Sequence, residues 1–369
     1  MKIHISPLTC VLGDVVANEH SAGFHFPGAE LLSDGSIYIC ARKDKGMDDP
    51  YGSTEAVRYF PETGELIPMP SPTAQDLTED GSRTAYGCYV SELAPNELIA
   101  VYGLIEPEGH KSLFDEKTFG ICKTTLRTTR SHDNGMTWEK SQALAYQTAD
   151  IMIPSKIFKT KDGIWGFHVE MHNHWEQDYR EPIQARFVYS VDGGKTFDRA
   201  AYIPHDENFL AGDARATMDL EGNLCSFFWG FDLVTLTDLS VYRSFSKDGG
   251  LSWSYVEPIK LEKQITSPFW IQNDTYMCIY QERFSDCPGL YAALSYDGGI
   301  TWDEENAVGI FVKGNAPKSA NAFDKGIDEA YTFGYSTLTK LAANKALATF
   351  WHSNGRTTCI SVCELTVEN

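Results

Sequence analysis

The stretch Ser295-Tyr-Asp-Gly-Gly-Ile-Thr-Trp302 decides the fold, because the chain writes its pattern, S-x-D-x-G-x-[TS]-[WF], four times. The other three copies are residues 131–138, 190–197 and 246–253. Successive copies begin 59, 56 and 49 residues apart. A motif that recurs at such a spacing indicates a repeat architecture, which has to be recognised before any local feature is interpreted.

Each copy has the chemistry of a hairpin tip. The Asp side chain can accept hydrogen bonds from backbone N–H groups just ahead of it, and the Gly can take a positive φ. The Ser and Thr hydroxyls can tie the flanking strands, and the final Trp or Phe is predicted to fill the gap to the next unit. The pattern resembles the Asp box of the sialidase-like, or BNR-repeat, β-propellers. That box is a structural device, so the resemblance implies a fold and not an activity.

A second repeat, an apolar strand followed by a turn and another apolar strand, alternates with the first. Short strands with frequent turn signals and little helical periodicity predict an all-β chain. The six copies of this hairpin occupy residues 29–42, 88–103, 155–170, 214–230, 268–283 and 337–352. We therefore predict that residues 1–369 form one domain, a six-bladed β-propeller of four-stranded antiparallel blades. Residues 2–6 are expected to complete the last blade beside the C-terminal strand, which would close the ring and remove both free edges.

The composition limits the partners and the compartment. Lys and Arg number 31 against 51 Asp and Glu, and the resulting net charge of −20 disfavours nucleic acid and anionic membranes as partners. Most of the nine Cys residues lie in apolar, strand-like runs, which predicts buried, reduced thiols in a reducing compartment. The first residues lack the apolar core of a signal peptide, so a cytoplasmic location is expected, or a secreted one if a leader was removed. No apolar run has the length of a transmembrane helix.

The loop geometry of a propeller predicts where a site would lie. The segments that enter each inner strand should gather on one face, at the axis, together with the segments that leave the second strands. The entering segments are residues 24–27, 84–87, 151–154, 211–215, 264–267 and 332–336.

On that face the resemblance to sialidases implies a nucleophile and its base. Gly334-Tyr-Ser-Thr-Leu338 resembles the sialidase segment that carries the tyrosine nucleophile, which would be Tyr335. A phenol with a pKa near ~10 needs a carboxylate beside it, and sialidases use Glu. Matching that strand over the turn Glu221-Gly222 puts Asp213 in the position of the Glu. The structural alternative is that Tyr335 is a buried aromatic between blades and Asp213 a loop cap.

The same resemblance implies an acid in the loop of residues 42–50. Asp44, Asp48 and Asp49 are all candidates, and the sequence does not choose among them. Spare charges in a solvated loop are the alternative interpretation of each.

The chain departs from sialidases at the three arginines that grip the sialate carboxylate. His25-Phe-Pro27 stands where the first would lie, and the other two would fall near Trp229 and Pro288. Because bidentate guanidinium–carboxylate pairing is hard to replace, an ordinary sialic acid is not expected as the substrate. Arg42, Arg215 and Arg283 are predicted to reach the same face, either as a different anion clamp or as rim residues paired with acids.

His25 is predicted to point at the axis, where an imidazole suits proton transfer. Some superfamily propellers that cleave rhamnose–glucuronate linkages are similar in using His. Glu170, His172 and His174 alternate and so share one face of an extended segment, as sugar ligands or, less in keeping with the pattern, metal ligands. Further substrate-binding candidates on this face are His172, His174, Trp229, Glu282 and His352.

These features predict a glycan-active enzyme, an exo-glycosidase that removes a terminal sugar other than an ordinary sialic acid. Its expected catalytic residues are Tyr335, Asp213, His25, Asp49 and Asp44, with no metal or other cofactor. The alternatives are a polysaccharide lyase acting on a uronate linkage, with His25 or Tyr335 as base, and a non-catalytic propeller that binds carbohydrate or protein. The sequence names neither the sugar, the linkage nor the oligomeric state.

Overall fold

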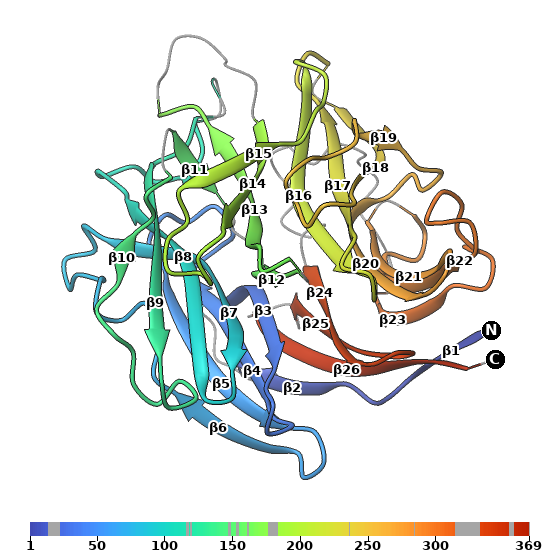
Figure 1. Ribbon diagram of the computed structural model, residues 1–369, viewed down its shortest axis with the longest axis horizontal. Helices are drawn as coiled ribbons and strands as arrows, with labels where there is room; N and C mark the ends of the chain where they lie inside the picture. Colours follow the sequence, from blue (N-terminus) through green and yellow to red (C-terminus); the bar gives the residue numbers. More distant parts are fainter. Residues whose placement is uncertain are drawn as a thin grey trace.

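The computed structural model is a ring of six antiparallel sheets around a central axis (Figure 1). It describes residues 1–13, 23–115, 118, 120–146, 149–152, 155–160, 162–175, 184–235, 237–283, 285–313, 333–353 and 358–368, without the side chain of Tyr335. Within these residues all regular structure is β-strand, and no helix is long and apolar enough to cross a membrane. The predicted six-bladed β-propeller with four-stranded antiparallel blades is confirmed.

The blades follow one another along the chain, each running from the axis outwards. Blade one is β3 (Gly23–Leu31), β4 (Ile37–Asp44), β5 (Ser53–Phe60) and β6 (Glu65–Met69). Blade two is β7 (Thr84–Ala94), β8 (Glu97–Glu106), β9 (Lys123–Ser131) and β10 (Gln142–Ala143). In blade three, β11 (Asp150–Met152) and β12 (Phe158–Lys159) both pair with β13 (Trp165–His172), followed by β14 (Gln184–Ser190) and β15 (Arg199–Tyr202).

Blades four and five repeat the four-stranded order. Blade four is β16 (Phe209–Met218), β17 (Leu224–Asp232), β18 (Thr237–Ser246) and β19 (Glu257–Pro258). Blade five is β20 (Gln264–Gln272), β21 (Thr275–Glu282), β22 (Gly289–Ser295) and β23 (Val308–Val312).

The sixth blade joins the two ends of the chain. It consists of β24 (Phe333–Ala342), β25 (Lys345–Ser353) and β26 (Thr358–Glu368), and β26 pairs in turn with two N-terminal strands. β1 (Lys2–Ile5) pairs antiparallel with the C-terminal end of β26, where Lys2 lies opposite Glu368. β2 (Thr9–Leu12) pairs with an earlier part of β26, where Thr9 lies opposite Val362. The predicted closure by residues 2–6 is therefore present, and a second N-terminal strand extends it (Figure 1).

All six predicted inner hairpins form, but the inner strands begin several residues earlier than expected. The entering segments are strands interrupted by β-bulges, which displace one or two residues from the ladder. The register shifts between His25 and Gly28, Tyr86 and Cys88, Gly212 and Arg215, Gln264 and Thr266, and Gly334 and Thr337. The same irregularity thus recurs at the same end of five inner strands.

The core lies between neighbouring blades. In β4, for example, Ile37, Tyr38 and Ile39 are all fully buried, because a propeller strand is covered on both faces by adjacent sheets. One apolar cluster joins blades three and four through Phe187 and Phe228, and another joins blades five and six through Ile279 and Phe350. The ring is therefore held by apolar contacts on both sides of every sheet.

The four S-x-D-x-G tips share one hydrogen-bond pattern. In the copy of blade five, the Ser295 hydroxyl donates to Asp297 at 2.8 Å and accepts the Gly299 N–H at 3.0 Å. Asp297 also accepts from the N–H of Thr301 at 3.0 Å and from its hydroxyl at 2.6 Å. The second Gly of the copy in blade four, Gly250, has a φ of 99°, and a Cβ there would lie 2.1 Å from the Phe187 ring. The motif therefore stabilises the turn through its hydrogen bonds, and its glycine lets the tip pack closely against the neighbouring blade.

In blades two, four and five the aromatic anchors pack against the preceding blade, which corrects the expectation that they fill the gap to the next unit. In blade three, Phe197 meets Phe167 of its own blade, with ring centroids 5.4 Å apart. Trp253 contacts Phe187 of blade three, with ring centroids 5.4 Å apart. Trp302 meets Phe227 of blade four edge-on at 5.8 Å, and Trp138 meets Tyr38 of blade one at 6.2 Å. In these three copies Gly135, Gly250 and Gly299 also lie against the preceding sheet.

Replacing Asp297 by Ala is expected to lower the free energy of unfolding by about 1–2 kcal/mol at pH 7, because four donors lose their acceptor. These hydrogen bonds hold the pKa of Asp297 below its ordinary value against the opposing effect of burial. Its contribution should therefore be complete above pH 4 and decline as the pH falls further. Urea unfolding at pH 7 and pH 3 measures the difference. Glu62, at the blade-one tip that lacks the motif, is the control, and an equal loss in Glu62→Ala would contradict the assignment.

Candidate functional site

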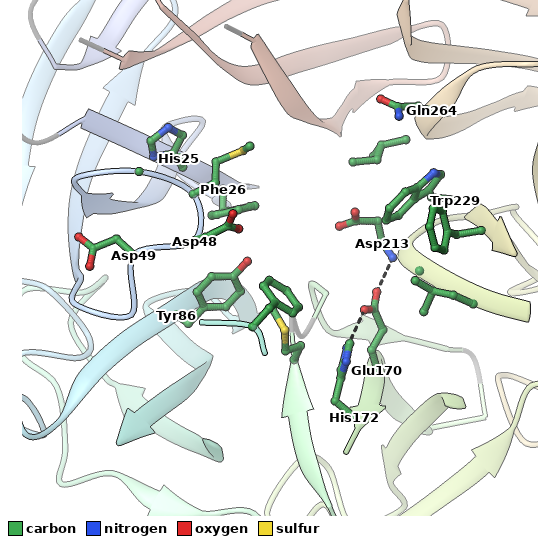
Figure 2. Close-up of a pocket in the computed structure, with 18 of the residues that line it drawn as sticks. His25, Phe26, Asp48, Asp49, Tyr86, Glu170, His172, Asp213, Trp229 and Gln264 are labelled. Atoms are coloured by element: carbon green, nitrogen blue, oxygen red, sulfur yellow. Dashed lines mark hydrogen bonds and ion pairs between the residues drawn. The ribbon is translucent and has the colours of Figure 1, made fainter. Parts of the chain in front are cut away.

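A cavity of about 660 Å³ opens at the axis, on the face where the inner strands begin. Its polar lining includes His25, Asp48, Glu170, Asp213 and Gln264 (Figure 2). Apolar and aromatic side chains form much of the remaining wall; they are Phe26, Met47, Phe114, Met152, Leu210, Trp229, Phe231, Leu233 and Ile265. The cavity lies on the predicted face, and the bulges of the inner strands deliver Phe26, Asp213 and Ile265 to it.

Asp213 is held in an unusual backbone conformation at the wall of the cavity. It lies in the bulge of β16 with a φ of 52°, a region that Asp tolerates better than most residues. Its N–H donates to the Glu170 carboxylate, and its carboxylate lies 3.6 Å from the Arg215 guanidinium. Burial raises the pKa of Asp213 to about 6; the Glu170 charge acts in the same direction, while Arg215 and Arg283 oppose it. A carboxylate with such a pKa suits proton transfer near neutral pH.

Asp48 faces Asp213 across the cavity (Figure 2). Its carboxyl can be reached from the cavity, yet the surrounding chain excludes enough water to raise its pKa. The Asp44 charge adds to this shift, and Arg42 and His25 oppose it. The Leu113 N–H donates to the Asp48 carbonyl at 2.7 Å, so the neighbouring blade fixes the backbone from which this carboxyl projects.

Arg42 lies beneath the Asp48 loop, fully buried, rather than in the cavity lining. Its guanidinium donates to the carbonyls of Met47 at 3.3 Å and of Asp49, and it pairs with Asp44 at 3.0 Å. Asp44 also accepts the Gly46 N–H at 3.0 Å. The loop of residues 43–50 therefore folds around the Arg42 guanidinium.

Asp49 and Asp44 are the other two candidate acids in this loop, and the Asp49 side chain joins the two ends of the loop. Its two oxygens accept the N–H groups of Lys45 at 3.1 Å and Tyr51 at 2.9 Å. Asp44 has no exposed side-chain surface. Asp48 and Asp49 both line the cavity, whereas Asp44 does not, and the Asp48 carboxyl is the one that faces Asp213 (Figure 2).

His25 lines the cavity and is held from behind. Its Nδ1 lies 2.7 Å from Asp44 Oδ1, and its ring meets Trp351 edge-on with centroids 4.8 Å apart. A carboxylate at Nδ1 fixes the orientation of an imidazole, as in other histidines that move protons. The essential role predicted for His25 remains a prediction.

Glu170 and His172 line the cavity together, whereas His174 turns outwards. His172 Nε2 lies 3.3 Å from Glu170 Oε2, and His174 Nδ1 pairs with Asp150 at 2.7 Å. The side chain of His174 is half exposed, and the cavity lining does not include it. Among the described residues no group of three His, Cys, Asp or Glu side chains is disposed to hold a metal.

A chain of hydrogen bonds fixes Trp229 beside Asp213. The indole N–H donates to Asp238 at 2.9 Å, and Asp238 accepts from Gln264 at 2.8 Å. Gln264 in turn accepts from Arg283 at 2.8 Å, and Arg283 also donates to the Phe333 carbonyl at 3.1 Å. Trp229 thereby presents a fixed aromatic surface next to a carboxylate. The sequence offered no signal for Asp238, because it acts through a neighbour, whereas Gln264 opens one of the entering segments predicted to lie on this face.

The remaining predicted residues lie apart. Of the three arginines, only Arg283 lines the cavity. Arg215 lies against Asp213 and lines a second, smaller pocket, and Arg42 is buried under its loop, so the three do not gather as one clamp. Glu282 pairs with Lys263 at 2.5 Å, and His352 contacts Ser361 and Cys359. The backbone of Tyr335 lies in the bulge of β24, but its side chain is outside the described part of the chain.

No protein-family model matches the chain, and no curated protein matches it either. Solved structures are similar in fold. A protein of unknown function from Dyadobacter fermentans shares 14% identity with a TM-score of 0.73, over 99% of each chain. The intramolecular trans-sialidase of Ruminococcus gnavus shares 12% identity with a TM-score of 0.62, over 93% of this chain and 94% of that one. The α-L-arabinanase of Penicillium chrysogenum, solved with arabinobiose, shares 10% identity with a TM-score of 0.58, over 97% and 98%.

Proposed function

We propose that the chain is a glycoside hydrolase that removes a terminal, uncharged sugar, with Asp48 as the acid and Asp213 as the base. The observation that carries the proposal is the pair of carboxyls facing each other across the cavity, both with raised pKa values (Figure 2). Two carboxyls that flank a glycosidic bond are the usual machinery for its hydrolysis. The similarity in fold to a trans-sialidase and an arabinanase supports a carbohydrate substrate.

In the proposed reaction Asp48 protonates the glycosidic oxygen as the bond to the anomeric carbon breaks. The phenol oxygen of Tyr335 attacks that carbon, and its proton passes to Asp213. Water then attacks the anomeric carbon and gives its proton to Asp48, while the departing Tyr335 oxygen takes its proton back from Asp213, which restores all three groups. Arg283 supports the pairing of Tyr335 with Asp213, since it opposes the raised pKa of Asp213 and donates to Phe333, two residues before Tyr335.

An uncharged sugar fits the cations of this site. Arg42 is fully buried under its loop, Arg215 donates to the Asp213 carbonyl at 2.7 Å, and Arg283 donates to Gln264 and Phe333. Each guanidinium already serves protein acceptors, and they do not converge on one point of the cavity. A sugar carboxylate would therefore lack the bidentate partners that it prefers.

A panel of 4-nitrophenyl glycosides, including the sialic acid derivative, tests the proposal through release of nitrophenol. Hydrolysis of one or more neutral glycosides is the expected result. Efficient release from the sialic acid derivative would overturn the argument from the arginines. A product that absorbs in the ultraviolet, formed from a uronate polymer, would instead show a lyase. Binding of a glycan without turnover, unchanged in Tyr335→Phe, would show a non-catalytic binding protein.

Replacing Glu170 by Gln is expected to shift the acidic limb of the pH–rate profile to lower pH. The negative charge of Glu170 raises the pKa of Asp213, so its removal lets Asp213 lose its proton at lower pH. Gln keeps a carbonyl oxygen that can accept the Asp213 N–H, so the backbone should hold. The measurement is kcat/KM from pH 4 to 8. Asp150→Asn, which removes a charge from the outward-facing His174, is the control, and an equal shift in that variant would contradict the assignment.

A further inference from the structure

Two cysteines and a histidine meet at the seam where the N-terminal strand β2 pairs with β26. Cys10 lies opposite Ser361, and Cys359, two residues earlier in β26, is on the same face of the sheet as Ser361. The two thiols are within hydrogen-bonding reach of each other. Neither cysteine forms a disulfide in this structure, and the cluster is separate from the cavity lining.

His352 supplies a base to this pair. Its Nε2 lies 3.4 Å from Cys359 Sγ and 2.8 Å from the Ser361 hydroxyl. Burial lowers the pKa of His352, so its imidazole is neutral at pH 7 and can accept a proton. The hydrogen bond with Cys10, together with burial, keeps Cys359 protonated until such a base acts.

The two cysteines differ in access. Cys359 is 1% exposed, whereas Cys10 is half-buried, so an oxidant from solution reaches Cys10 first. Cys359 then lies in position to attack the Cys10 sulfur and to displace the group that has become attached to it. This arrangement of an accessible thiol beside a resolving thiol favours an intramolecular disulfide over a lasting adduct.

We propose that Cys10 and Cys359 are a site of reversible oxidation, at which a small disulfide such as glutathione disulfide links β2 to β26. In the first step Cys10 attacks glutathione disulfide, forming a mixed disulfide and releasing one glutathione, which takes the Cys10 proton. In the second, Cys359 gives its proton to His352 and attacks the Cys10 sulfur. The second glutathione leaves as a thiolate and takes that proton, so two protein thiols are oxidised and one glutathione disulfide is reduced.

The bond would fasten the ring at its closure. β2 is held to β26 by a short ladder with an irregular register between Cys10 and Leu12, and a covalent link there spans almost the whole chain. A cross-link that closes so long a loop restricts the unfolded chain strongly. Oxidation is therefore expected to raise Tm by about 5 °C.

A second pair of neighbouring thiols provides the matched control. Cys40 of β4 and Cys88 of β7 are within hydrogen-bonding reach of each other between blades one and two, but both are buried, at 1% and 2% exposure. With no accessible member, this pair should stay reduced in the folded protein. Cys287 is exposed and reports that the oxidant is active.

The experiment incubates the folded protein with glutathione disulfide, alkylates the remaining thiols and maps the digest by mass spectrometry. A Cys10–Cys359 peptide pair, with Cys40 and Cys88 alkylated and Cys287 glutathionylated, is expected. The rise in Tm should appear in the wild type and in Cys40→Ser, vanish in Cys10→Ser and Cys359→Ser, and reverse with dithiothreitol. His352→Gln should slow the linkage about tenfold. Glutathionylation of Cys287 without any Cys10–Cys359 pair would overturn the proposal, as would a stable glutathione adduct on Cys10.

Discussion

Replacing Asp213 by Asn is expected to lower kcat by about 10³-fold while leaving the protein at least as stable at pH 7. The loss of rate follows from removing the group proposed to take the nucleophile's proton. Asn matches Asp in size and also tolerates a positive φ, so the bulge of β16 should survive the change. The measurement is kcat on the active aryl glycoside beside urea unfolding of the same sample.

The effect on stability has a definite sign. The folded-state pKa of Asp213, about 6, is above the unfolded value, so the folded protein binds this proton more tightly. Its contribution is most favourable at low pH and is lost as the pH rises from about 4 to about 6. At pH 7 the ionised carboxylate therefore costs up to about 3 kcal/mol, which Asn removes.

Asp219, in the turn of the same hairpin, is the matched control. It accepts the N–H groups of Glu221 at 2.8 Å and Asn223 at 2.9 Å. Asp219→Asn should therefore lower stability modestly and leave kcat unchanged. If Asp213→Asn instead loses stability at pH 7 and keeps its rate, Asp213 is a cap of the bulge and the proposed mechanism fails.

Replacing Asp48 by Asn is expected to lower kcat/KM by about 10²–10⁴ for glycosides with alkyl leaving groups. For 4-nitrophenyl glycosides the loss should be about tenfold or less, because a nitrophenolate leaves without a proton. The basic limb of the pH–rate profile should also disappear, since it reports the loss of the Asp48 proton. Comparing the two leaving groups in one variant isolates the acid role from general damage.

Asp49 provides the adjacent control. Because it accepts two N–H groups within its own loop, Asp49→Asn should affect both leaving groups equally and reduce the rate by about tenfold at most. A strong dependence on the leaving group in Asp49→Asn, with none in Asp48→Asn, would move the acid role to Asp49.

Most of the fold could be predicted from the two sequence repeats. Four tips and six inner hairpins in phase were enough to predict six blades and the N-terminal strand that closes the last one, because each motif works through its own local hydrogen bonds. The direction in which Trp253 and Trp302 pack was predicted wrongly, since a repeat looks the same from either neighbour. The bulges were missed as well, because strand alternation is the signal for a strand and a bulge breaks it.

The site was less predictable because strand alternation and register decide which side chains face it. Trp351 and His352 are adjacent in β25, so one strand cannot turn both to the axis: Trp351 meets His25, and His352 meets Cys359. Arg42 lies near the end of β4, where a substrate-binding residue was expected, but its side chain lies between blades one and two, against the Ala85 carbonyl and the Tyr86 ring. The position of Arg42 decides how the loop of residues 42–50 folds. Without it, no pattern in the sequence shows that Asp48, rather than Asp44 or Asp49, faces Asp213.

The recurring bulges separate reactivity from architecture. Residues displaced from the ladder, such as Phe26, Asp213 and Ile265, face the cavity without being required for the pairing of their strands. A new side chain at such a position alters the chemistry of the cavity while the blade keeps its partners. A combinatorial library at Ile265, which is displaced in this way and has no proposed catalytic role, would therefore explore new substrate preferences on an unchanged ring. The same separation is consistent with the similarity in fold between this chain and solved structures that are only 10–14% identical to it in sequence.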